Sequence, residues 1–174
     1  MPSIASMVLT AVLLSSSGGG VGAPRKYTLP SGIELTIVET PFKRTQFRIS
    51  GCGSEGVACR INGRIPFGRT AALPKSYVSS ITISFAGATY ALDASDMYDA
   101  WDGRPMEHPG GIRYLGGRCI DAKNCQIRGL FSDGAGTFVA EWRVVNGQPV
   151  RTILTDSSDV VDLFMKHIDP PVFE

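Results

Sequence analysis

The strongest constraint on the fold of this chain is a series of short segments in which apolar and polar residues alternate. Residues 80–85 alternate and return as residues 89–92, and residues 137–145 turn at Asn146-Gly147 and return as residues 150–154. A period of two is that of a strand with one buried face, and Asn-Gly favours a tight hairpin turn. Further strands are expected at residues 33–38, 46–50, 57–61, 111–115 and 125–131, and Asn62-Gly63 predicts a second tight hairpin turn after residues 57–61. The pattern predicts a mainly β protein, an antiparallel sandwich or barrel-like domain.

The period changes near the C-terminus. Within residues 156–168 the apolar positions recur at helical spacing, at Val160, Val161, Phe164, Met165 and Ile168. This spacing predicts a C-terminal α-helix, which Asp169-Pro170-Pro171 would end. We also expect a short internal helix over residues 95–101, in which Met97 and Trp101 would lie one turn apart.

The N-terminal segment has the pattern of an export signal. Residues 4–14 form an apolar run that is too short to span a bilayer, and small residues follow it up to Gly22. We therefore expect a signal peptide over residues 1–22 and a single domain over residues 23–174. No later segment is apolar enough to be a membrane helix, so stable membrane insertion after signal removal is not expected.

The four cysteines form two pairs that are close in sequence, Cys52 with Cys59 and Cys119 with Cys125. Four cysteines allow three pairings, and we favour the two local ones because each pair brackets a turn-prone stretch. The spacings are longer than those of zinc knuckles, so no metal site is expected. Disulfides and an export signal together indicate a periplasmic or secreted protein.

Charge is spread unevenly, although the net charge is only +1. Residues 25–75 carry nine Lys and Arg against three Asp and Glu, and residues 76–174 carry eight against thirteen. The arginines near the first cysteine pair are Arg44, Arg48, Arg60, Arg64 and Arg69. They predict either a basic face for an acidic partner or ion pairing between the two halves of the fold. Nucleic acid is not expected as a partner, because the basic segment lacks dense aromatic interleaving.

Candidate chemistry is concentrated in residues 92–108. Asp93, Asp96, Asp99 and Asp102 recur every three residues, and Glu107 and His108 follow them. On a helix, this spacing would bring several carboxylates together for acid–base work or cation binding. The alternative is a capped short helix whose carboxylates are solvated. Neither a Gly-x-Ser-x-Gly nor a His-Glu-x-x-His motif occurs, and no cofactor is expected.

Several stretches carry a resemblance to other proteins: residues 65–68 (IPFG), 90–93 (YALD), 97–101 (MYDAW), 112–119 (IRYLGGRC), 128–133 (RGLFSD), 138–142 (FVAEW) and 169–171 (DPP). Over most of residues 60–174 the chain resembles a group of small, uncharacterised exported proteins of Gram-negative bacteria. That resemblance implies no catalytic residues. Exported β-rich proteins of this size include periplasmic immunity proteins, which block toxins from rival cells, but this is an analogy of class.

Two functions follow as hypotheses. The first is a periplasmic binding or inhibitor protein, including the immunity class, with a protein partner. Its candidate contact residues are Tyr98, Trp101, Arg104, Arg44, Arg48 and Arg64, because aromatic and arginine side chains dominate interfaces. The second is a cell-envelope hydrolase, acting on glycan or peptidoglycan, that uses carboxylates among Asp96, Asp99, Asp102 and Glu107 with His108. The absence of a catalytic motif favours the first.

Overall fold

The computed structural model describes residues 22–52, 59–68, 72–101, 113–132 and 136–171. The strands are β1 (Arg25–Thr28), β2 (Glu34–Pro41), β3 (Ile49–Ser50), β4 (Arg60–Ile61), β5 (Ser76–Phe85), β6 (Ala88–Leu92), β7 (Leu115–Asp121), β8 (Asn124–Phe131), β9 (Phe138–Val145) and β10 (Gln148–Thr155). The helices are the 3-10 turn η1 (Arg44–Gln46) and α1 (Ser158–Lys166). The mainly β fold with a C-terminal helix is confirmed. The expected signal segment falls almost wholly outside the described residues.

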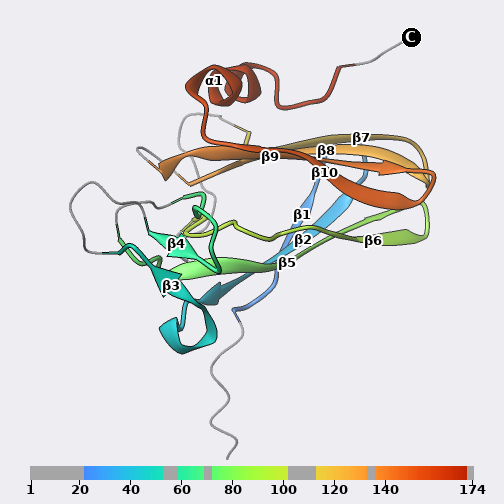
Figure 1. Ribbon diagram of the computed structural model, residues 1–174. Helices are drawn as coiled ribbons and strands as arrows, with labels where there is room; N and C mark the ends of the chain where they lie inside the picture. The colour runs from blue at the N-terminus through green and yellow to red at the C-terminus, as the bar shows by residue number, and fades with distance from the viewer. Residues whose placement is uncertain (1–21, 53–58, 69–71, 102–112, 133–135, 172–174) are drawn as a thin grey trace, which may run out of the picture.

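The strands form two antiparallel four-stranded sheets that face each other (Figure 1). The first sheet has the order β1-β2-β5-β6, and the second has the order β10-β9-β8-β7. The short strands β3 and β4 pair separately at one end of the molecule. The sheets do not close into a barrel. Of the two architectures expected, the sandwich is therefore the one that forms.

Tight turns set the register of the hairpins. Asn146 and Gly147 have φ of 52° and 80°, and Asn62 and Gly63 have φ of 53° and 84°. Positive φ at both central residues gives the turn a twist that matches the flanking strands. Both predicted Asn-Gly turns are confirmed. Pro149 lies in β10, which is the edge strand of its sheet, where a missing N–H is tolerated.

The main core lies between the two sheets. The first sheet contributes Leu35, Ile37, Ile81 and Ile83, and the second contributes Ile127, Phe131, Phe138, Ala140 and Trp142. The ring of Phe131 stacks on Phe138, with centroids 5.2 Å apart, and meets Trp142 edge-on at 6.1 Å. The Trp142 indole N–H donates to the carbonyl of Asp93, 2.8 Å away, so the largest core side chain buries no unpaired donor.

A second core forms between the second sheet and α1, which lies on the outer side of that sheet (Figure 1). Val161 and Phe164 of the helix pack with Leu130 and Val139, which point outward from β8 and β9. Strands β8 and β9 are therefore covered on both faces. The observed helix is shorter than the predicted span of residues 156–168.

An ion pair fastens this helix to the sheet. Arg128 donates from Nε to Oε2 of the buried Glu141 at 2.9 Å, and from Nη1 to the carbonyl of His167 at 3.0 Å. Its guanidinium also lies 4.8 Å from the ring centre of Phe164. Burial by itself would raise the pKa of Glu141, but hydrogen bonds from Arg128, Gln126 and Thr152 outweigh it. The net effect lowers that pKa below its usual value.

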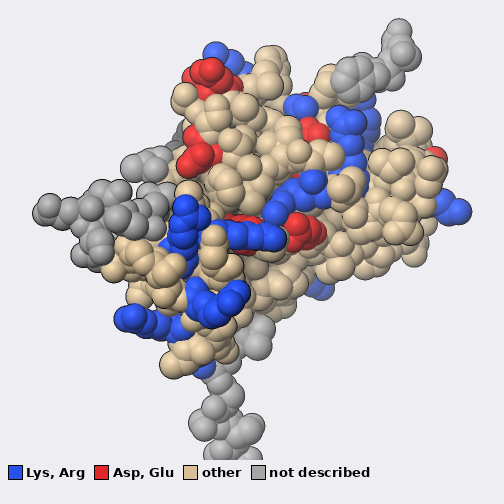
Figure 2. Space-filling view, in the orientation of Figure 1, with Lys and Arg blue, Asp and Glu red and all other residues tan. Residues whose placement is uncertain are grey.

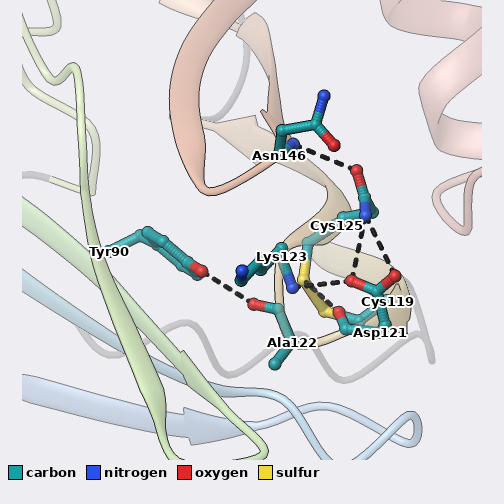
Figure 3. Close-up of a disulfide and its surroundings, with 8 residues drawn as sticks. Tyr90, Cys119, Asp121, Ala122, Lys123, Cys125 and Asn146 are labelled. Carbon is teal, nitrogen blue, oxygen red and sulfur yellow. Dashed lines mark hydrogen bonds between the residues drawn. A yellow bond between two sulfur atoms is a disulfide. The ribbon is translucent and has the colours of Figure 1, made fainter.

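The cysteines pair as the local assignment predicts, Cys52 with Cys59 and Cys119 with Cys125. The second disulfide crosses from β7 to β8 beside the turn that joins them (Figure 3). The Tyr90 hydroxyl of the opposite sheet donates to the carbonyl of Ala122 in this turn, 2.8 Å away. The disulfide corner therefore also ties the two sheets together.

The short internal helix expected over residues 95–101 does not form. The segment has a turn at Ser95 and Asp96 and isolated bridges at Met97 and Tyr98, and after the positive φ of 43° at Asp99 it bends at Ala100 and Trp101. The only helical turn among the described residues before α1 is η1. No helix in the described part of the chain is long and apolar enough to cross a membrane.

Substituting Glu141→Gln tests the ion pair that fastens α1. We expect a loss of about 2 kcal/mol in unfolding free energy at pH 7, because a hydrogen-bonded charge is removed beside the buried Arg128. The pKa of Glu141 is lower in the folded protein than its ordinary value of 4.5, so the ionised side chain stabilises the fold above pH 4.5. This contribution is lost as the pH falls through the folded-state pKa. Denaturant titrations should therefore show the two proteins converging at acid pH.

Glu34→Gln provides the matched control, because the Glu34 side chain is exposed on β2. This variant should unfold like the wild type at every pH. Equal stability of Glu141→Gln and wild type at pH 7 would contradict the role given to the ion pair.

Candidate functional site

The site most suited to binding is the β3–β4 module, which we define as residues 42–52 and 59–68. Strand β3 pairs with β4 through Ile49 with Ile61 and Ser50 with Arg60, and the disulfide Cys52–Cys59 follows directly. Two-residue strands have little stability of their own. The disulfide and the Asn62-Gly63 turn therefore supply the local constraints that hold this unit together.

Four exposed arginines of the module form what we call the arginine surface: Arg44, Arg48, Arg60 and Arg64. Figure 2 shows Lys and Arg side chains gathered at the lower left, the end at which Figure 1 places β3 and β4. Guanidinium groups bind carboxylates through two parallel hydrogen bonds. This surface is therefore chemically suited to an acidic partner. Arg69, which the sequence analysis grouped with these four, lies outside the described residues.

Aromatic packing fixes the module to the first sheet. The rings of Phe42 and Phe47 stack with centroids 4.6 Å apart. Phe47 meets Tyr77 of β5 edge-on at 5.3 Å, and Tyr98 lies 6.3 Å from Phe47 and 6.1 Å from Phe42. Such pairs are worth about 1 kcal/mol each beyond burial. The arginine surface is thus carried on a packed base.

Arg64 is the member of the arginine surface that has an internal anion. Its Nη1 lies 2.8 Å from Oδ2 of Asp96, and the arginine side chain remains 67% exposed. The hydrogen bond and the charge of Asp96 raise the pKa of Arg64. Burial, followed by the charge of Asp96, raises the pKa of the nearby Tyr98 hydroxyl to about 12. Tyr98 is therefore neutral at physiological pH.

Among the described residues, the carboxylates predicted to gather on a helix have separate partners, because the helix does not form. Asp93 pairs with Arg151 at 3.1 Å, and Asp96 pairs with Arg64. Asp99 is buried and accepts the backbone N–H groups of Lys75 and Ser76. The other residues of the hydrolase hypothesis, Asp102, Glu107 and His108, lie outside the described residues. The spacing of three residues therefore does not support an acid–base cluster.

Sequence reasoning missed one buried polar group, formed by Glu39, Ser76 and Asp99. The Ser76 hydroxyl donates to Oε1 of Glu39 at 2.5 Å and lies 3.4 Å from Oδ1 of Asp99. The backbone N–H of Trp101 also donates to Oε1 of Glu39. Leu35 and Ile37 of β2 face the core, and the same alternation places Glu39 on that face. The burial of Glu39 could therefore have been predicted from the sequence of β2. The cluster joins β2, β5 and the 97–101 segment.

Two of the expected contact residues are part of the core. Tyr98 is 5% exposed and Trp101 is 8% exposed, and the Trp101 ring lies 5.1 Å from that of Phe131. Arg44, Arg48 and Arg64 are exposed. Arg104 lies outside the described residues. Tyr98 and Trp101 therefore lie beneath the surface and support it, whereas the three arginines are accessible.

A groove of about 410 Å³ lies beside the arginine surface. It runs along the outer face of β5 and β6 and is walled at one end by the module, with Phe47, Asn62, Tyr77, Ser80, Ala91 and Asp96 among its lining residues. Its volume is in the range of small-molecule pockets. No sequence pattern predicts this groove, because it depends on where β6 leaves β5.

Comparisons with protein-family models, with curated proteins and with solved structures give no match for this chain. Among the described residues, no group of three or more His, Cys, Asp or Glu side chains is placed to hold a metal ion. The functional argument therefore depends on the arginine surface and the adjoining groove.

The supporting position of Trp101 is tested by Trp101→Ala. This change should lower the unfolding free energy by about 3 kcal/mol, because it leaves a large cavity against Phe131. Arg44→Ala is the control, since Arg44 is exposed on η1, and its denaturation midpoint should match that of wild type. An unchanged midpoint for Trp101→Ala would show that the ring is not part of the core.

Proposed function

We propose that this chain is an exported binding protein of the inhibitor or immunity class, which holds an acidic protein partner through the arginine surface. One observation carries the proposal. Arg44, Arg48 and Arg60 are exposed, and none of them forms an ion pair with a described residue. Surface cations without internal anions attract and orient an acidic partner.

The competing explanation, internal pairing between the basic and acidic halves, accounts for part of the charge only. Arg64 pairs with Asp96 across the two halves. The other acidic residues with described partners bind elsewhere: Asp93 pairs with Arg151, Glu141 with Arg128 and Arg143, and Asp169 with Arg113. Three arginines of the surface therefore remain available to a partner.

The two disulfides support export, because disulfides form and persist in oxidising compartments. They fit a periplasmic or extracellular protein, and the expected signal over residues 1–22 points the same way. A small disulfide-stapled sandwich gives a rigid platform, which reduces the entropy lost on binding. These features support a protein that acts by holding a partner.

The test is an affinity capture with the purified, disulfide-bonded protein, followed by titration of the captured partner. Extracts of the producer's periplasm and of competing strains serve as the source. Arg44→Glu with Arg48→Glu should weaken binding at least about tenfold, because two attractive charges become repulsive. The affinity of the wild type should also fall as salt rises.

Lys123→Glu with Lys166→Glu is the matched control. It makes the same change in net charge at exposed positions near the second sheet and on α1, and it should bind like wild type. Equal weakening by both double variants would show that only net charge matters. Unchanged binding of the Arg44 and Arg48 variant would remove the arginine surface from the interface.

A further inference from the structure

The groove beside the arginine surface exists because the β5–β6 ladder is interrupted. Pairing runs from Phe85 with Ala88 to Ile81 with Leu92, and it resumes only at Tyr77 with Tyr98. Three residues of β5 (78–80) thus lie opposite five residues of the returning chain (93–97). The longer segment bulges away from β5 between the two contact points. The opening places Ser79 and Ser80 at the floor of the groove.

The walls of the groove combine flat apolar surfaces with polar groups, of which one, the Asp96 carboxylate, is charged. Phe47 and Tyr77 are half-buried, so part of each ring faces the groove. Ser80 contributes a hydroxyl, Asn62 an amide and Asp96 a carboxylate. No Lys or Arg lines the groove, since Arg64 is engaged by Asp96 at the rim.

This combination selects the chemistry of a ligand. Asp96 is the one charged side chain in the described lining, and its ion pair with Arg64 leaves the groove without net charge, so a phosphate, sulfate or uronate would lose its water there without gaining a free counter-charge. A purely apolar ligand would bury the Ser80 hydroxyl and the side-chain N–H groups of Asn62 without hydrogen-bond partners, which costs free energy. The best match is a neutral molecule with one apolar face and many hydroxyl or amide groups.

We propose that the groove is a binding site for a neutral glycan about two sugar rings long. The apolar face of one ring would pack on Tyr77 and Phe47, and its hydroxyls would donate to Asp96 and exchange hydrogen bonds with Asn62 and Ser80. The site adjoins the arginine surface through the Arg64–Asp96 ion pair, but neither Arg44 nor Arg48 lines it. It therefore stands or falls independently of the protein partner proposed above.

The experiment titrates the isotopically labelled, disulfide-bonded protein with three neutral disaccharides, cellobiose, maltose and diacetylchitobiose, and with digalacturonate as the anionic comparison. Backbone amide shifts are followed by NMR. At least one neutral disaccharide should give saturable shifts concentrated at Ser80, Ala91 and Asp96, and digalacturonate should give none. Absence of saturable shifts with all three neutral sugars overturns the proposal, as does preferential binding of digalacturonate.

A variant that fills the groove locates the site. Ala91→Tyr places a ring in the groove from an exposed strand position, where tyrosine is well tolerated, and it should weaken binding at least about tenfold. Thr89→Tyr is the control, because Thr89 is exposed two residues earlier on β6 and does not line the groove. It should bind like wild type. Undiminished binding by Ala91→Tyr, or equal weakening by both variants, overturns the location.

Discussion

The segment from Met97 to Trp101 is the constraint on which the rest of this structure depends. Its backbone hydrogen-bonds to Phe67 of the β3–β4 module, to Ser76 and Val78 of β5, and, through Ala100, to Ser132 after β8. Gly68 packs so closely on the Tyr98 carbonyl that a β-carbon there would overlap it. One short segment therefore joins the module, the first sheet and the second sheet, and its side chains fill the space between them.

This arrangement explains how a weak unit can present a binding surface. Of the two-residue strands β3 and β4, only Ile61 is deeply buried, beside Cys59, which precedes β4; this is too little for independent stability. The module gains order from its disulfide and from rings that pack on Tyr77 and Tyr98. Its arginines and the neighbouring groove thus stand on a base fixed by the 97–101 segment, and both proposed sites lie at the same end of the sandwich.

Local chemistry made much of the fold predictable, and non-local pairing made the rest unpredictable. The Asn-Gly turns, most of the alternating strands and the helical spacing of Val161, Phe164 and Ile168 each depend on a few residues, and they reappear in the structure. The strand expected at residues 111–115 instead runs from Leu115 to Asp121, and only Ile49–Ser50 of residues 46–50 is a strand. The prediction of a helix over residues 95–101 was wrong. Met97 and Trp101 have helical spacing, but they are buried by contacts with residues distant in sequence, which outweigh the local preference for a helix. The basic face was one of two alternatives left open by the sequence, and the burial of Glu39 follows from the alternation within β2; the groove required knowledge of which strands pair.

Amide hydrogen exchange at Tyr98 and Asp99 tests the central claim most directly. Their N–H groups donate to the carbonyls of Phe67 and Ser76, and buried backbone hydrogen bonds open only when the surrounding structure unfolds. Both amides should therefore exchange as slowly as those of Ile81 and Ile83 in the centre of β5. Exchange as fast as in the exposed turn at Ala86 and Gly87 would show that the segment does not hold the sheets and the module together.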